Sequence, residues 1–316
     1  MNLTHLPGTD LDVFPISLGS TALGSTLDRA ASFRLLDAYA EAGGNFIDTA
    51  LVYANWLPIE RSISEKTIGA WVRERHNRAR MVLSTKGAHP ELDSMHVARL
   101  SPAEITADLE ASLRHLGVET IDLYWLHRDD PSRPVAEILA TLNEHARAGK
   151  IRYYGCSNWR TPRIREAQDF ARAHGLPGFA GNQMMWALAV IEPGRLADPT
   201  LAVMDDAMYQ YHCQSGLLAM PYTSQAGGYF SKLAAGRVTN PGNPYDLPAN
   251  QARLERIRQL SAETGLTLTQ IVLGYLLSQP FASVPIIGPK SLAQLQDSLT
   301  AASVRLAPDQ LNFLTK

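Results

Sequence analysis

Four polar side chains with complementary acid–base chemistry stand at or just after the ends of apolar runs. Asp48, Lys86 and His127 each close such a run. Tyr53 lies five residues after Asp48, in what should be the adjoining loop. A carboxylate, an amine, an imidazole and a phenol gathered in one cleft could transfer a proton to or from a bound substrate.

The four residue types would support one another chemically. A free tyrosine has a pKa of about 10 and is a weak acid at neutral pH, but a nearby ammonium lowers that pKa. Asp48 can keep Lys86 charged, and Lys86 can then tune Tyr53. His127 can donate a hydrogen bond to a substrate oxygen. Alone, each residue has an ordinary structural explanation, such as a helix cap or a core histidine, so their joint placement carries the interpretation.

Short apolar runs alternate with amphipathic segments along the chain, and several runs are apolar at consecutive positions, as in strands covered on both faces. The runs predict eight strands, at residues 15–19, 46–49, 81–86, 121–127, 151–157, 181–185, 217–222 and 283–288. The amphipathic segments predict helices at residues 28–42, 62–75, 102–116, 134–148, 161–175, 198–212, 251–264, 267–278 and 291–302.

This alternation predicts an α/β fold, a single-domain (β/α)8 TIM barrel across residues 1–316, with an open doubly wound sheet as the alternative. In such a barrel the carboxyl ends of the strands meet on one face, which carries the active site and would gather the four residues. Residues 223–250 interrupt the rhythm with glycines and prolines. A loop of this length is usually functional, and this one would hang over the same face.

The composition is that of an ordinary soluble globular protein, with 45% hydrophobic and 19% charged residues. The net charge of −2 offers no electrostatic footprint for nucleic acid or for an anionic membrane. No apolar stretch approaches the ~20 residues of a membrane helix, and the first residues lack signal-peptide features, so a cytoplasmic location is expected. Cys156 and Cys213 have no metal-ligand spacing and are predicted to be buried thiols. Nothing indicates an oligomeric state.

Two motif-like segments do not support other chemistries, and a third motif is absent. Residues 19–26 resemble a phosphate loop, but Ser25 stands where the lysine is required. His127-Arg128-Asp129 matches the first letters of a kinase catalytic loop, without the other kinase motifs. The Gly-x-Gly-x-x-Gly pattern of a Rossmann dinucleotide site is absent.

Several motifs together resemble the aldo-keto reductase family. They are Asn45–Tyr53, Ser64–Gly69, Ser84–Gly87, Ile121–His127, Gly149–Trp159 and Pro285–Ser291, in the family's order and spacing. The resemblance covers roughly residues 13 to 303. It implies a barrel that binds a nicotinamide cofactor at its carboxyl face, with Tyr53 as general acid and with Asp48, Lys86 and His127 completing a catalytic tetrad.

The resemblance also implies a cofactor track, with NADPH preferred and NADH as an alternative. Its members should hold the carboxamide, stack on the nicotinamide ring, approach the pyrophosphate, meet the 2′-phosphate and flank the adenine. In that order they are Ser157, Asn158 and Gln183; Tyr222; Thr223, Ser224 and Gln225; Gly288, Lys290 and Ser291; and Gln294, Asp297 and Ser298. Gln294 stands where the family often has an arginine, which leaves Lys290 as the matched cation.

The predicted function is reduction of an aldehyde or ketone to an alcohol, with a sugar or polyol aldehyde as one candidate substrate. Residues on or beside strand ends are candidate pocket walls, although simple packing explains each nearly as well; they are Trp56, His89, Trp125, Asp129 and Trp159. One alternative is a metal-dependent hydrolase using Asp48, His127 and Asp129, but the usual three or four ligands are missing and no metal is expected. Another is a regulatory subunit that senses nicotinamide nucleotides without rapid turnover.

Overall fold

The computed structural model describes residues 3–237 and 242–316, and its centre is an eight-stranded parallel sheet. All eight predicted strands form and pair in the order β10-β3-β4-β5-β6-β7-β8-β9. They are β3 (Ser17–Gly19), β4 (Phe46–Asp48), β5 (Val82–Gly87), β6 (Ile121–Leu126), β7 (Ile151–Ser157), β8 (Gly181–Met185), β9 (Leu218–Tyr222) and β10 (Ile286–Ile287). A bridge between Ala219 and Ser283 joins the sheet's two ends, so the sheet forms the predicted (β/α)8 barrel rather than the open alternative.

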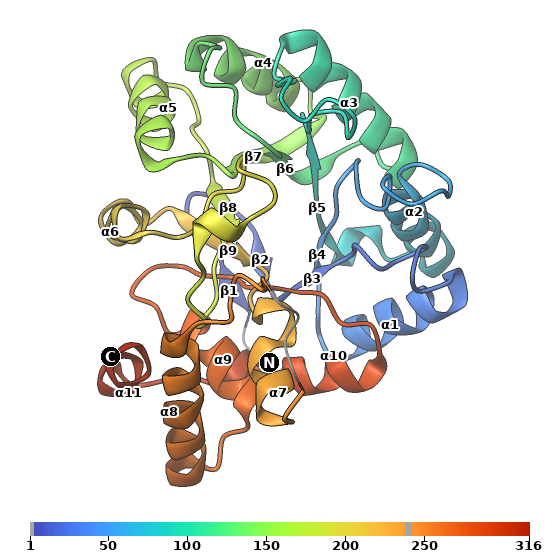
Figure 1. Ribbon diagram of the computed structural model, residues 1–316. Coiled ribbons are helices and arrows are strands. Elements are labelled where there is room, and N and C mark those ends of the chain that lie inside the picture. Colours follow the sequence, from blue (N-terminus) through green and yellow to red (C-terminus); the bar gives the residue numbers. More distant parts are fainter. Residues whose placement is uncertain (1–2, 238–241) are drawn as a thin grey trace.

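Helices surround the strands, and α1 to α6 follow one another around them in Figure 1. The main helices are α1 (Arg29–Glu41), α2 (Ile63–Arg75), α3 (Pro102–Leu116), α4 (Val135–Arg147), α5 (Thr161–Ala173), α6 (Asp206–Ser215), α8 (Pro248–Thr264), α9 (Leu268–Leu277) and α10 (Leu292–Leu299). Local signals explain several ends. Ser101 and Glu104 form a capping box at the start of α3, and Gly117 ends that helix with a φ of 65°.

Two predicted segments differ from the structure. The helix predicted at residues 198–212 begins only at Asp206, because Asp205 caps it and Val203 forms a bridge to Met185. The predicted loop at 223–250 contains a short helix, α7 (Tyr229–Ala234), since Tyr229 and Phe230 are buried in a satellite hydrophobic cluster. Residues 238–241 of that segment lie outside the described residues.

Other features were not predicted. A terminal helix, α11 (Pro308–Thr315), packs against α8. Cys213 is exposed, although Cys156 is buried as expected. Within residues 3–237 and 242–316, no helix combines the length and the apolar character needed to cross a membrane.

A short N-terminal hairpin covers the amino end of the barrel. It pairs β1 (Thr4–His5) with β2 (Asp12–Val13) and was not predicted. Its apolar residues join the barrel interior, in a cluster made of Leu6, Leu11, Val13, Phe46, Val82, Leu123, Trp125, Leu218, Met220, Val284 and Ile286. Asn45 ties the hairpin down, because its amide donates to the Asp12 carbonyl at 3.0 Å and accepts from the Phe14 amide at 2.7 Å.

Replacing Asn45 with alanine should therefore loosen the covered end without touching the opposite face. Loss of both hydrogen bonds should lower the free energy of unfolding by about 1–3 kcal/mol. Urea denaturation would measure the change, with the exposed Asn312→Ala as the matched control. A variant as stable as the wild type would contradict this role for Asn45.

Candidate active site

The four predicted residues meet at the carboxyl face, around the ammonium of Lys86. Its Nζ donates to Asp48 Oδ2 at 2.5 Å, to the Thr49 carbonyl at 2.7 Å and to Tyr53 Oη at 3.0 Å. All three N–H bonds of the amine are thus used. Asp48 Oδ1 accepts further hydrogen bonds from Ser84 and Gln183, at 2.7 and 2.8 Å. Hydrogen bonds with residues of β5, of β8 and of the loop after β4 therefore hold the carboxylate and the amine in place.

His127 completes the group from the end of β6. Its ring lies edge-on to that of Tyr53, with 6.0 Å between ring centroids. Its Nδ1 is buried and has no hydrogen-bond partner among the described residues. The tautomer with hydrogen on Nε2 avoids burying an unpaired N–H, and it leaves Nε2 as a donor toward the pocket that His127 lines.

Burial and charge set the protonation states. Burial, together with the charge of Asp48, raises the pKa of Tyr53 by more than Lys86 and Arg128 lower it, so the net shift is opposite to the sequence-based expectation. Burial lowers the pKa of Lys86, but Asp48 and Tyr53 more than compensate and the pKa is raised overall. Burial, helped by Arg128, holds the pKa of His127 well below its usual range. At neutral pH the phenol is protonated, the amine charged and the imidazole neutral.

A long pocket of about 880 Å³ runs from this group toward α10. Its volume lies in the range of ligand sites, roughly 300–1,000 Å³. Tyr53, Lys86 and His127 line one part of it. The predicted cofactor residues that also line it are Ser157, Asn158, Tyr222, Thr223, Ser224, Gln225, Gly288, Lys290, Gln294, Asp297 and Ser298.

Two predicted cofactor residues, Ser291 and Gln183, are not part of the pocket lining. Ser291 caps α10 through the Gln294 amide and does not line the pocket. Gln183 is fully buried beside Asp48, and its Oε1 has no partner among the described residues. A buried acceptor without a donor is costly, so this oxygen is suited to an N–H group of a bound molecule.

Asn158 is held by the protein itself. Its Nδ2 donates to the His127 carbonyl and to Ser157 Oγ, at 3.2 and 3.1 Å. Its Oδ1 accepts from the Ala202 amide and from the Tyr222 hydroxyl. Its φ of 63° is left-handed, a strained conformation that proteins concentrate at functional sites. The structure thus gives Asn158 a positioning role and leaves its amide no free hydrogen for a carboxamide.

The far end of the pocket is suited to an anion. Lys290 lies just before the capped start of α10, where helix N–H groups favour negative charge. Lys232 and Arg237, from the segment after β9, line the same pocket. Sequence reasoning missed these two cations, although both stand in the long segment it singled out. Gly227 and Gly228, with φ of 62° and 78°, let that segment turn close to the pocket.

Of the five predicted substrate residues, two lie beside the tetrad and three are not pocket walls. Trp56 is 54% exposed and lies edge-on to Tyr53, and the His89 ring lies 4.7 Å from that of His127. Trp125 and Trp159 are wrong as pocket walls, because both are 0% exposed. Trp125 points into the barrel interior.

The indole of Trp159 donates to the Arg128 carbonyl and packs on Phe179. Asp129 is not a pocket wall either. It pairs with Arg163 at 3.4 Å, and its burial raises its pKa to about 6.

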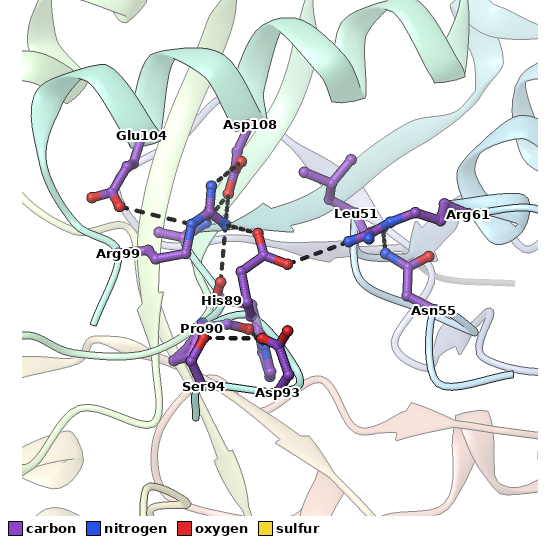
Figure 2. Close-up of polar contacts among 12 residues, drawn as sticks. Leu51, Asn55, Arg61, His89, Pro90, Asp93, Ser94, Arg99, Glu104 and Asp108 are labelled. Atoms are coloured by element: carbon purple, nitrogen blue, oxygen red, sulfur yellow. Dashed lines mark hydrogen bonds and ion pairs between the residues drawn. The ribbon is translucent and has the colours of Figure 1, made fainter. Parts of the chain in front are cut away.

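Ion pairs brace the loops that carry Trp56 and His89 (Figure 2). Arg61, on the loop after β4, pairs with Glu91, on the loop after β5, at 3.3 Å. Arg99 pairs with Asp108 of α3 at 2.9 Å and donates to the His89 carbonyl at 3.0 Å. These contacts surround a second cavity of about 300 Å³. The two loops at this side of the mouth are therefore joined to each other and to α3.

The geometry does not suit the metal-hydrolase alternative. Asp48 is bound to Lys86, and Asp129 is paired with Arg163. Across residues 3–237 and 242–316, no three His, Cys, Asp or Glu side chains gather as they would around a metal ion.

Comparison with known proteins agrees with the barrel fold. The family model described as "Aldo/keto reductase family" matches residues 15–316. An uncharacterized oxidoreductase, YrpG of Bacillus subtilis, is 29% identical over 99% of this chain and 95% of its own. An aryl-alcohol dehydrogenase [NADP(+)] of Phanerodontia chrysosporium is 27% identical over 98% of this chain and 83% of its own. Norsolorinic acid reductase stcV of Emericella nidulans is 29% identical, over 96% and 78% respectively.

A solved structure has the same fold. The thermostable aldo-keto reductase Tm1743, crystallised with the inhibitor epalrestat, aligns with a TM-score of 0.74 at 21% identity, covering 100% of this chain and 99% of that one. The chain belongs to the aldo/keto reductase family. It is an oxidoreductase of a family that generally uses nicotinamide nucleotides.

The Asp48–Lys86 pair should be essential to stability as well as chemistry. Asp48→Asn would leave a buried ammonium without its counter-charge, which typically costs about 3–5 kcal/mol. Chemical denaturation at neutral pH would measure this. The exposed ion-paired Asp169→Asn is the control, expected to cost less than about 1 kcal/mol. Equal effects of the two substitutions would contradict the assignment.

The same pair sets a pH dependence. The folded-state pKa of Lys86 is raised above its ordinary value of 10.5. Its contribution to stability is therefore fully present below that value and is lost as pH rises through the folded-state pKa. The stability difference between wild type and Asp48→Asn should narrow at strongly alkaline pH, which denaturation at increasing pH would test.

Proposed function

We propose that this protein is an NADPH-dependent reductase that converts an aldehyde or ketone to an alcohol, with Tyr53 as the general acid. The observation that carries the proposal is the 3.0 Å hydrogen bond from Lys86 Nζ to Tyr53 Oη at the head of the long pocket. It places a protonated phenol beside a fixed positive charge. NADH is the alternative cofactor.

The chain's residues fit a nicotinamide dinucleotide. The Ser157 hydroxyl and the unpartnered Gln183 Oε1 would hold the carboxamide, and the Tyr222 ring would stack on the nicotinamide. Lys290, with Lys232 and Arg237, would meet the phosphates. When bound, the cofactor supplies the hydride that adds to the carbonyl carbon.

The tetrad would manage the proton and the charge. His127 Nε2–H donates a hydrogen bond to the substrate carbonyl oxygen and orients it. Tyr53 then transfers its proton to that oxygen, which develops negative charge during the reaction. Lys86 stabilises the phenolate that remains, and Asp48 keeps Lys86 charged and in position. Since His127 is neutral, the phenol is the better proton donor.

Two classes of carbonyl substrate are candidates for this pocket. Polar groups near the mouth suit the sugar or polyol aldehyde suggested by the sequence. The exposed Trp56, which lies edge-on to Tyr53, and the activity named for the aryl-alcohol dehydrogenase relative suit an aromatic carbonyl. Purified protein with NADPH and matched panels of both classes would distinguish them. Tight cofactor binding without turnover on either panel would instead support the sensing subunit.

Tyr53→Phe should remove the acid while leaving the pocket's shape. General acid catalysis is worth about 10²–10⁴-fold, so kcat should fall by that factor, while the dissociation constant for NADPH stays the same. Steady-state kinetics and fluorescence titration would measure the two effects. Tyr209→Phe, at a tyrosine that does not line the pocket, is the control. Retention of most of the kcat would refute the acid assignment.

Lys290→Met should act on the cofactor alone. Loss of a charge-assisted contact to the 2′-phosphate should weaken NADPH binding by about tenfold or more, with little change for NADH, which lacks that phosphate. Fluorescence titration with both nucleotides would show the difference. Lys150→Met, at a lysine paired with Glu110 outside the pocket, is the matched control. Equal weakening of both nucleotides would overturn the 2′-phosphate role.

A further inference from the structure

Arg128 is a nearly buried cation in the pocket lining to which neither the tetrad nor the cofactor track assigns a role. Arg128 is 7% exposed and follows His127 directly, just after the end of β6. In the sequence analysis Arg128 appeared only as part of the His127-Arg128-Asp129 motif, which occurs without the other kinase motifs. A buried guanidinium is expensive to desolvate, so its contacts show what it is held for.

The guanidinium joins two parts of the site. Its Nη1 donates to the His127 carbonyl at 2.9 Å. Its Nε donates to Thr200 Oγ1 at 2.8 Å, and its Nη2 donates to Asp198 at 2.9 Å. Both partners lie between β8 and α6, in a segment that was predicted as helix and instead forms a turn at residues 198–201. Arg128 therefore ties residues 198–200 to the end of β6.

The same segment continues into the pocket wall. Leu201 lines the pocket, and the Ala202 amide donates to Asn158 Oδ1 at 3.1 Å. Asn158 also holds Tyr222, the proposed nicotinamide platform. Asp198, Thr200 and Ala202 thus fasten the segment at both ends of Leu201. Arg128 is the charged fastening, and its two partners come from loop residues that have no strand ladder to hold them.

We propose that Arg128 is a positioning residue for the reduction, which fixes the 198–202 wall beside the reacting groups and supplies a second buried positive charge there. The proposal rests on the proposed function. The Arg128 charge affects its neighbours in the direction that the proposed reaction requires. It lowers the pKa of His127 and, as a smaller contribution, that of Tyr53. It thereby favours a neutral imidazole and eases proton loss from the phenol.

Three substitutions separate position from charge. Arg128→Lys keeps the charge but loses the fork that reaches Asp198, Thr200 and the His127 carbonyl together. Arg128→Met removes both the charge and the fork of N–H donors. Thr200→Val removes, at an exposed position, the hydroxyl that accepts from Arg128 and donates to Asp198, so it weakens the tie while both charged side chains of the ion pair stay in place. Arg163→Met is the matched control, since Arg163 is also an ion-paired arginine with a mostly buried side chain but lies outside the pocket lining.

The first measurement is kcat/KM together with the dissociation constant for NADP⁺. Misplacement of a reacting group by about 1 Å can cost about 10²-fold. Arg128→Lys and Arg128→Met should each lower kcat/KM by about tenfold to 10²-fold and weaken NADP⁺ binding, Thr200→Val should do so to a smaller extent, and Arg163→Met should leave both unchanged. Values within threefold of wild type for both Arg128 variants would overturn the proposal. If they fail to fold, wild-type values for Thr200→Val would overturn it.

The second measurement is the pH profile of kcat/KM. Activity should fall as Tyr53 loses its proton, and the charged and titratable groups around Tyr53 and Arg128 are Lys86, Asp48, His89, His127, Asp198 and Tyr222. Arg128→Met should move this alkaline limb to higher pH, and Arg128→Lys should leave it near the wild-type position. A merely structural arginine would move neither. Should wild type show no turnover, the proposed function fails, whereas the NADP⁺ dissociation constants still test the tie.

Discussion

The site depends on keeping an ammonium charged inside a barrel from which water is largely excluded. Lys86 is 2% exposed, and its three N–H bonds are met by a carboxylate, a carbonyl and a phenol. A buried charge persists only when it is paired and fully hydrogen-bonded. Asp48 must therefore sit on the neighbouring strand, and Ser84 and Gln183 must in turn hold Asp48. The position of the proposed proton donor, Tyr53, is therefore set by the hydrogen bonds that Lys86 requires.

Much of this could be predicted from the chain. Short apolar runs predicted all eight strands, because strands covered on both faces are rich in apolar residues. The polar ends of these runs then identified Asp48, Lys86 and His127. Capping chemistry, as at Ser101 and Gly117, marked helix boundaries with little dependence on tertiary context. Family motifs added the cofactor residues, most of which line the pocket.

The rest could not be predicted, because it depends on where side chains point and on distant contacts. Trp125 precedes His127 by two residues, so it shares the inward face but lies one layer deeper in the barrel. Residues 198–205 have a composition compatible with a helix, yet pairing of Val203 with Met185 and the Arg128 tie hold the segment in a non-helical conformation. The fall in Tyr53 acidity on burial depends on surroundings that sequence does not reveal.

The way the barrel closes has a consequence for how the chain is made. β3 lies near the beginning of the chain and β10 near its end, and the two are hydrogen-bonded neighbours. During synthesis β3 therefore waits, with one edge open, until β10 has been produced. Open strand edges invite pairing with other chains. The hairpin that covers the amino end packs against Ile286 and Val284, so it too completes its contacts only at that last stage.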